Sequence, residues 1–311
     1  MASPDWSPAR PRDHGNPTML SLDDLNGASG HDFVAALGAV FEDAPWVAEA
    51  AARKRPHATV EGLFAAMRGA VEAAPDALRL TLLTGHPELA GHAARAGAIA
   101  AESIAEQASA GLDRLSEAEY ARFEALNAAY RETFGFPFIL CIKRHGRASL
   151  LRSFEARAAS DAATERATAE AEVLRIAAIR LNALVSGEGP LRTTGRISTH
   201  VLDTVHGKPA GGIAIDLLEW VSAAEIVLVA QTVTNADGRT DAPLIGGRPV
   251  PIASYELRFH IGDHFRACGL PVTEPPFLDI VPLRFGVSDP EGHYHVPLVA
   301  TPWSYQTYRG S

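Results

Sequence analysis

The sequence predicts a multi-domain protein, in which an all-α helical domain is followed by an all-β sandwich. The 311 residues exceed what a single hydrophobic core usually organises. Up to about residue 184, apolar residues recur at the three- and four-residue spacing of amphipathic helices. Beyond a Gly- and Pro-rich stretch, polar and apolar residues alternate with the two-residue period of strands. We therefore expect a disordered lead-in over 1–18, the helical domain over 19–184, a linker over 185–194 and the β domain over 195–311.

The helical half has a recognisable start and several long helix-forming stretches. Ser21 precedes Leu22, Asp23 and Asp24, an arrangement in which a serine hydroxyl caps a first helix. The apolar residues that follow at helical spacing are Phe33, Leu37, Val40 and Phe41. The stretches rich in Ala, Glu and Arg are Gly97–Gln107, Glu117–Phe134 and Glu155–Leu184. This pattern predicts a bundle of amphipathic helices.

The β half shows alternation and turn signals. Residues 255–261 alternate between apolar and polar, which places one face in a core and the other in solvent. Asn235–Gly238 and Asp289–Gly292 are turn sequences between such strands. Residues 292–298 form a further strand-like run. The pattern predicts an antiparallel sandwich or barrel.

Composition and charge exclude several classes of protein. The net charge of −9 argues against nucleic-acid binding, which needs clustered Lys and Arg. No apolar run approaches the roughly 20 residues of a membrane helix. Cys141 and Cys268 are too few and too far apart for a disulfide framework or a thiolate metal site. We expect small-molecule chemistry in a reducing compartment, the cytoplasm.

Four residues of the β half have side chains suited to catalysis: His200, Arg239, His295 and Ser311. Taken singly, each has an ordinary structural explanation. His293 and His295 share a strand face at a spacing that also suits zinc, with His200 as a possible third ligand. A metallo-hydrolase stays open on spacing alone, but we expect no metal, because no carboxylate or cysteine stands beside these histidines. The specific ending Tyr308–Ser311 is expected to be ordered and close to a site.

Taken together, segments of the β half resemble one family. The segments are Ser198–Asp203, Gly207–Ala210, Thr234–Arg239, His293–Leu298 and the ending Tyr308-Arg309-Gly310-Ser311. Over about residues 195–311 they are similar to 5-hydroxyisourate hydrolase, the transthyretin-related enzyme of urate breakdown. The resemblance implies a transthyretin-like sandwich that assembles into tetramers. It also implies that His200 and His295 move protons, while Arg239 and the tail residues Tyr308, Arg309 and Ser311 bind the urate-like carbonyls.

A second resemblance covers roughly residues 19–184. Its segments are Gly85–Gly91, where Pro and Gly surround His86, then Ser103–Gln107 and Phe134–Ile139. Alone, the first is explained as a loop between helices with a capping histidine. Together they resemble the decarboxylase of 2-oxo-4-hydroxy-4-carboxy-5-ureidoimidazoline (OHCU). The resemblance implies that His86 and Glu106 are catalytic. It implies substrate contacts from Pro87, Ser103, Gln107, Phe138, Ile139 and Arg180, with Arg175 as a neighbouring alternative to Arg180.

The two resemblances imply consecutive reactions, as in the fused allantoin synthases. The β domain is expected to hydrolyse 5-hydroxyisourate to OHCU, and the helical domain to convert OHCU to S-allantoin with release of CO2. No cofactor is expected, because the imine of this substrate can accept the electrons that CO2 leaves behind. The partners are then small-molecule substrates and further copies of the chain, without nucleic acid or membrane. The alternative is a transthyretin-like carrier of small ligands with a helical oligomerisation domain.

Overall fold

The computed structural model describes residues 19–91, 103–104, 106–107, 112 and 115–310. These residues divide into two compact units. The first unit holds the residues up to Ala73 together with Ala177–Leu191, and the second holds Ala74–Ile176 and the β part from Arg192 onward. Residues 1–18, predicted to be a disordered lead-in, lie outside the described part. The described helices include none that is long and apolar enough to cross a membrane.

The first unit begins with short helices whose starts are capped by hydroxyl side chains. Its elements are β1 (Leu20–Ser21), α1 (Leu22–Gly27), α2 (Gly30–Leu37), η1 (Gly38–Phe41), α3 (Pro45–Ala52), α4 (Val60–Glu72), the end of α10 (Ala162–Leu184) and β2 (Val185–Ser186). Ser21 Oγ accepts the Asp23 N–H at 3.2 Å, which confirms the predicted first cap. The predicted apolar residues Phe33, Leu37, Val40 and Phe41 are all buried.

The segment after α10 packs on this first unit. β2 pairs in parallel with β1, so that Val185 lies opposite Leu20. The carbonyl groups of Glu188 and Gly189 accept the backbone N–H groups of Val60 and Glu61, the first two residues of α4. Backbone groups at a helix start have no partner within the helix, so these carbonyls satisfy two of them. The predicted domain limits at 184, 194 and 195 stay predictions.

The helices of the second unit follow the predicted stretches with one break. They are α5 (Asp76–Thr84), α8 (Glu117–Phe134), η3 (Ile142–Arg144), α9 (Arg147–Ala158) and the start of α10. A reciprocal capping box between Ser116 and Glu119 starts α8, and Gly135 ends it at a φ of 77°. The stretch predicted from Glu155 is divided, because Asp161 Oδ1 accepts two backbone N–H groups and starts α10. Most of 97–107 lies outside the described residues.

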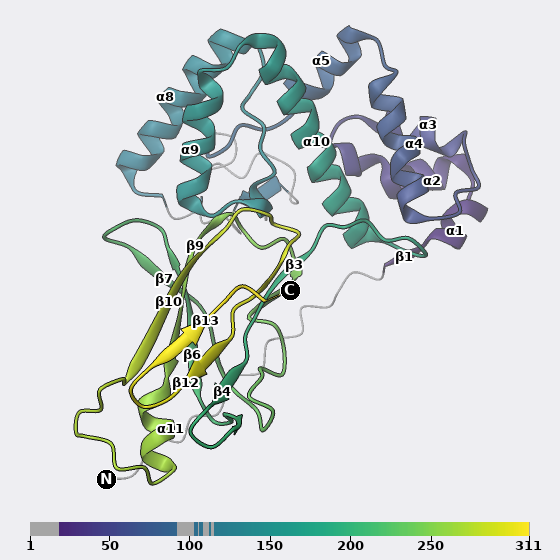
Figure 1. The fold of residues 1–311 in the computed structure, drawn as a ribbon. Coiled ribbons are helices and arrows are strands. Elements are labelled where there is room, and N and C mark those ends of the chain that lie inside the picture. The colour runs from purple at the N-terminus through teal and green to yellow at the C-terminus, as the bar shows by residue number, and fades with distance from the viewer. Residues whose placement is uncertain (1–18, 92–102, 105, 108–111, 113–114, 311) are drawn as a thin grey trace. The chain divides into compact units, whose positions relative to one another are not determined.

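The β part of the second unit contains three sheets around one core (Figure 1). Its elements are β3 (Gly195–Ser198), β4 (Val201–Asp203), β5 (Lys208–Pro209), β6 (Ala214–Trp220), β7 (Ile226–Val233), β8 (Ile245–Arg248), β9 (Ala253–His260), α11 (Ile261–Ala267), β10 (Ile280–Val287), β11 (His293–His295), β12 (Leu298–Ala300) and β13 (Tyr305–Thr307). The strand orders are β10-β9-β6-β7, β11-β3-β8 and β13-β12-β4-β5. The core includes Ile197, Ile215, Leu257 and Phe259, all fully buried. The predicted β domain is confirmed.

Three features of this part differ from the prediction. The pairs β3–β11 and β4–β12 are parallel, so the expectation of a purely antiparallel domain is wrong. Parallel neighbours need a long connection, and here the intervening strands supply it. The half predicted to be all-β also contains α11, which lies at one end of β9 and β10 (Figure 1). Glu256, expected to face solvent, is buried, because Arg258 and Arg284 donate to its carboxylate.

Tyr294, the central residue of β11, fixes the turn that precedes this strand. Its side chain is 3% exposed. The Tyr294 hydroxyl accepts the backbone N–H of Ser288 at 3.0 Å and that of Asp289 at 2.8 Å. The phenol therefore holds the turn between β10 and β11 in place, and with it the start of the strand that carries two histidines.

We expect Tyr294→Phe to lower the free energy of unfolding by about 1–3 kcal/mol, because two N–H groups lose their acceptor in a partly buried turn. Thermal or urea unfolding of the full chain measures the change. The control is Phe277→Leu, since Phe277 is exposed and lies outside this turn; its effect should stay within about ±0.5 kcal/mol. Equal stability of Tyr294→Phe and wild type would contradict this role.

Candidate active sites

A pocket of about 470 Å³ opens in the β part of the second unit. Strand and loop residues form it, and most of them are polar or charged. The lining residues are Arg196, Ser198, Thr199, Arg239, Thr240, Asp241, Ala242, Pro243, His293, His295, Tyr308 and Gly310. Three of the predicted hydrolase residues, Arg239, His295 and Tyr308, therefore line the same pocket.

Backbone pairing brings His200 next to Arg239. The two residues form an isolated antiparallel bridge, and the Val201 N–H donates to Gly238 O at 2.8 Å. Gly238 has a φ of +69°, and a Cβ at this position would lie 2.3 Å from Val201 O. Only glycine fits both conditions. The predicted turn Asn235–Gly238 thus positions Arg239 opposite His200.

The chain end returns to His295, as predicted from its specific sequence. The Gly310 N–H donates to His295 O at 2.8 Å. The Arg309 guanidinium lies over the Tyr294 ring, 4.7 Å from its centroid. A Cβ at Gly310 would stand 2.6 Å from Cδ2 of the His295 ring, so the imidazole and the tail backbone are in close contact. Ser311, the last predicted residue of this site, lies outside the described residues.

Ser198 links the two histidines of β11, a role that sequence reasoning missed. The register places Ser198 opposite His295 and Arg196 opposite His293. Ser198 Oγ is 3.0 Å from His295 Nδ1 and 2.8 Å from His293 Nε2. This contact occupies Nδ1 of His295, which leaves Nε2 as the nitrogen for proton transfer. The alternation of residues along each strand shows which side chains share a face. It does not show which residues of two strands lie opposite each other, and only the register in the structure places Ser198 beside His295.

The zinc alternative for these histidines gains no support from the geometry. The rings of His293 and His295 have centroids 6.0 Å apart. Among the described residues, the metal-ligating side chains whose ligand atoms converge are Asp203, His206 and Cys268, not the histidines of the pocket. A shared strand face therefore does not make the pair a ligand set, since ligand atoms must also meet at one point.

Burial and positive charge lower the pKa of His200 and of His295, which favours the neutral form of each ring. Burial lowers the pKa of His200, and the Arg239 guanidinium lowers it further. The pKa of His295 is lowered by burial, then by Arg239, His293 and His200. Nε2 of His200 is buried and has no hydrogen-bond partner in the described part of the chain. Neutral imidazoles beside a permanent cation can accept a proton from water while the cation holds developing negative charge.

In the helical part, Gln107 holds the loop that contains His86. The Gln107 side-chain carbonyl accepts the Ala90 N–H at 2.9 Å, and its amide donates to Glu88 O at 3.2 Å. Asn127, which the sequence did not single out, donates to Leu89 O at 2.8 Å. Both ends of the Gln107 amide are thus engaged with backbone. This geometry makes Gln107 a support for the loop, in addition to any contact with substrate.

The other predicted residues of the helical part are mostly buried. His86, Ser103 and Glu106 are buried, and Pro87 is half-buried in the loop after α5. Lys143 Nζ lies 3.4 Å from Glu106 Oε1, a contact that sequence reasoning missed because the partners are distant in sequence. The Lys143 ammonium and the Glu106 carboxylate thus form an ion pair.

Phe138 and Ile139 belong to an aromatic cluster. The Phe138 ring is 1% exposed and stacks on Phe154 with centroids 3.9 Å apart. Ile139 O accepts a hydrogen bond from Arg157 at 2.8 Å. Because the Phe138 ring is enclosed in this way, only backbone groups near it remain for a ligand.

The two candidate arginines have different carboxylate partners. Arg180, in the first unit, pairs with Glu42 at 3.0 Å. Arg175 contacts Glu172, three residues earlier on the same helix. The Glu172 carboxylate also accepts the Cys141 N–H at 2.8 Å, so the contact of Arg175 serves a helix-to-loop connection.

Comparison with known proteins gives a separate result for each part. The profile of the OHCU decarboxylase family matches residues 26–182, and that of the HIUase/transthyretin family matches residues 197–310. A 5-hydroxyisourate hydrolase of Deinococcus radiodurans is 54% identical over 115 residues, which are 37% of this chain and 95% of that protein. A 2-oxo-4-hydroxy-4-carboxy-5-ureidoimidazoline decarboxylase of Halalkalicoccus jeotgali is 41% identical over 167 residues, 54% of this chain and 93% of that protein.

One solved structure spans both parts. The crystal structure of an (S)-allantoin synthase matches with a TM-score of 0.51 and 32% identity, covering 94% of this chain and 100% of that one. The chain is therefore built from two enzyme folds in tandem. It belongs to the OHCU decarboxylase family through its helical part and to the HIUase/transthyretin family through its β part.

We expect Arg239→Met to raise the pKa of both His200 and His295, because it removes the cation that lowers them. Histidine titration by two-dimensional NMR measures the shift. The control Arg196→Met should raise the pKa of His293, which Arg196 lowers, and leave His200 unchanged. Since neutral imidazoles are required, the acid limb of hydrolase activity should move to higher pH in Arg239→Met. An unchanged His200 titration would contradict this arrangement.

We expect Gly310→Ala to lower hydrolase turnover by up to about 100-fold, since displacing a catalytic group by ~1 Å costs that much. The added Cβ would press on the His295 ring at 2.6 Å. The control Gly286→Ala adds a Cβ with nothing within 4 Å and should retain full activity.

Deleting Tyr308–Ser311 should impair hydrolysis as well and leave decarboxylation intact. Full hydrolysis by the shortened chain would show that the tail has no part in the site.

Proposed function

We propose that this chain catalyses two consecutive reactions of urate breakdown. The β domain hydrolyses 5-hydroxyisourate to OHCU, and the helical domain decarboxylates OHCU to S-allantoin. The observation that supports the first reaction best is the assembly of Arg239, His295 and the tail backbone around one polar pocket, with His200 bridged to Arg239. The second reaction is supported by the family of the helical part and by the buried His86 and Glu106 in the matching segments.

The hydrolysis uses a neutral histidine as base. A water molecule gives a proton to His200 or His295 as its oxygen attacks the ring carbonyl. The developing oxyanion is held by the guanidinium group of Arg239. The ring C–N bond then breaks, and the protonated histidine returns a proton to the leaving nitrogen. Ser198 keeps the His295 ring in one orientation through the contact with Nδ1.

The decarboxylation draws on the electronic structure of the substrate. When the C–C bond to the carboxylate breaks, its electron pair moves into the adjacent imine. His86 favours the loss of CO2 by its position, and a proton delivered to one face fixes the S configuration. The Glu106 carboxylate, paired with Lys143, orients the imidazole or the substrate. Backbone groups near Ile139 are the proposed contacts of the ureido-imidazoline.

A carrier function fits the pocket less well. A carrier of apolar ligands needs a largely apolar cavity. This pocket instead presents Arg196, Arg239, His293 and His295, and its histidines are tuned toward the neutral form. Such groups suit proton transfer and the binding of urate-like carbonyls. We propose that the protein is located in the cytoplasm. The free thiols of Cys141 and Cys268 are compatible with a reducing compartment of this kind.

Separate sites predict separable defects. His295→Ala should lower hydrolysis of freshly made 5-hydroxyisourate by about 10²- to 10⁴-fold, the usual contribution of a general acid or base. It should leave decarboxylation of supplied OHCU unchanged. His86→Ala should do the reverse. Circular dichroism follows the formation of S-allantoin in both assays. Loss of both activities from either change, in a folded protein, would rule out two independent sites.

We also propose that the β domain assembles into a homotetramer. Trp303, Tyr305 and Tyr308 are exposed on or beside β13, an edge strand whose residues are all exposed. Exposed aromatic side chains on an open strand edge are typical of an interface. Light scattering should give a mass four times that of one chain. A fully active monomer would refute the assembly.

A further inference from the structure

A cluster of potential metal ligands surrounds Asp203, at the end of β4. The Asp203 carboxylate is 1% exposed. Its Oδ1 accepts the backbone N–H groups of Val205 at 2.9 Å and His206 at 3.1 Å. Its Oδ2 lies 2.6 Å from His206 Nδ1 and 3.0 Å from His264 Nε2. The turn after β4 thus fixes one carboxylate oxygen, while two imidazoles converge on the other.

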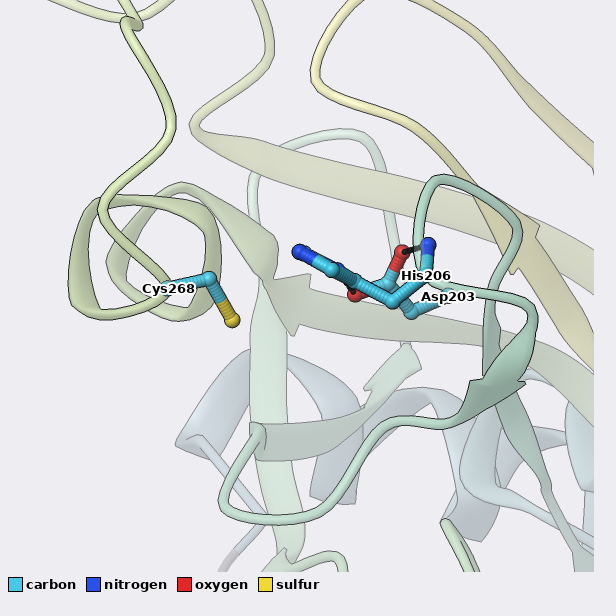
Figure 2. Close-up of side chains that lie close together, drawn as sticks. All are labelled: Asp203, His206 and Cys268. Carbon is cyan, nitrogen blue, oxygen red and sulfur yellow. Dashed lines mark hydrogen bonds and ion pairs between the residues drawn. The ribbon is translucent and has the colours of Figure 1, made fainter.

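The fourth member of the cluster is Cys268. It follows His264 by one helical turn, so both side chains lie on the same face of α11 and its C-terminal cap. Cys268 Sγ is 3.7 Å from His264 Nε2. Ligand atoms of Asp203, His206 and Cys268 all lie within 4.8 Å of one another. Figure 2 shows the Cys268 sulfur on the side of the helix that faces Asp203 and His206.

We propose that Asp203, His206, His264 and Cys268 bind a zinc ion, or another divalent metal of similar preference. One thiolate, two imidazoles and one carboxylate are ligand types that zinc accepts in tetrahedral sites. Zinc–ligand bonds of about 2.0–2.3 Å place tetrahedral ligand atoms roughly 3.3–3.7 Å apart. The observed separations of 2.6, 3.0 and 3.7 Å are close to that range. The other separations within Asp203, His206 and Cys268 do not exceed 4.8 Å.

Charge and protons balance on binding. The carboxylate and the thiolate carry two negative charges, which neutralise the divalent cation. The Cys268 thiol releases its proton to solvent. Metal–ligand bonds replace the two hydrogen bonds to Asp203 Oδ2. The proton that each imidazole donates to this oxygen leaves the ligating nitrogen, and each neutral imidazole then carries its single proton on its other nitrogen. No oxidant or reductant is needed.

The proposed role of this site is structural. It connects the turn after β4 to α11, two segments that no other described metal cluster joins. None of the four ligands lines the hydrolase pocket. Metal binding to the folded form alone stabilises that form in proportion to the logarithm of the free metal concentration. We therefore expect chelation to lower the melting temperature and to leave the hydrolase rate at low temperature unchanged.

The experiment uses the reduced, metal-free full chain titrated with Co²⁺, a spectroscopic substitute for Zn²⁺. We expect one equivalent of Co²⁺ per chain to give a thiolate-to-cobalt charge-transfer band with visible bands of tetrahedral Co²⁺, and Zn²⁺ to remove them. Cys268→Ser should abolish the charge-transfer band. His206→Ala should weaken binding by about 100-fold or more, because loss of partners beyond the ligands already costs about 10- to 100-fold. Cys268 is exposed, so its replacement does not endanger folding.

Two matched variants test whether the charge-transfer band comes from the proposed site. Cys141→Ala removes the other cysteine, which is buried, and should retain the band. His295→Ala removes a histidine of the hydrolase pocket and should retain it too. Absence of the band from wild type, its survival in Cys268→Ser, or its loss in Cys141→Ala or His295→Ala would each overturn the proposed site.

Discussion

The hydrolase pocket depends on the parallel contact between two bent strands, β3–β4 and β11–β12. At the bend of the first, Ser198 O accepts the Val296 N–H at 3.0 Å and His200 O accepts the Leu298 N–H at 2.8 Å. Between them, the buried Thr199 hydroxyl donates to Val296 O at 2.7 Å. These three bonds join the two chain segments between the β3–β11 pair of one sheet and the β4–β12 pair of the next. His200 and His295 stand on either side of this connection, so their separation is set by backbone.

Backbone also controls the approach of the other groups. The turn that ends at Gly238 positions Arg239, and the tail places Gly310 against the His295 ring. A Cβ at Gly238 would collide with Val201 O, and a Cβ at Gly310 would collide with the His295 ring. In the helical part, Gln107 and Asn127 hold the backbone of the loop after His86 in a comparable way. Both candidate sites thus place histidines on segments whose conformation is fixed by hydrogen bonds. Such preorganisation limits the motion of a catalytic group before the reaction.

Local patterns predicted the local structure well. The capped start at Ser21, the helix Glu117–Phe134 and the turn Asn235–Gly238 were visible because each depends on residues close in sequence. Strand direction and register were not visible, because a two-residue period is the same in parallel and antiparallel sheets. For that reason Ser198 and Lys143 were missed, since their partners lie far along the chain. The residues of the pocket came from family resemblance, and the structure supplied their contacts.

The same side chains serve different chemistry when the nearby charges differ. His293 and His295 have the spacing of a metal-binding pair, yet burial lowers the pKa of His295, and the nearby Arg239 and Arg196 lower it further. Cations that disfavour a proton on an imidazole disfavour a metal ion there for the same electrostatic reason. Around Asp203 the arrangement is reversed, because a carboxylate and a thiol face the two imidazoles and attract a divalent ion. Spacing along a strand therefore identifies a histidine pair, while the charge of its neighbours decides between proton transfer and metal binding.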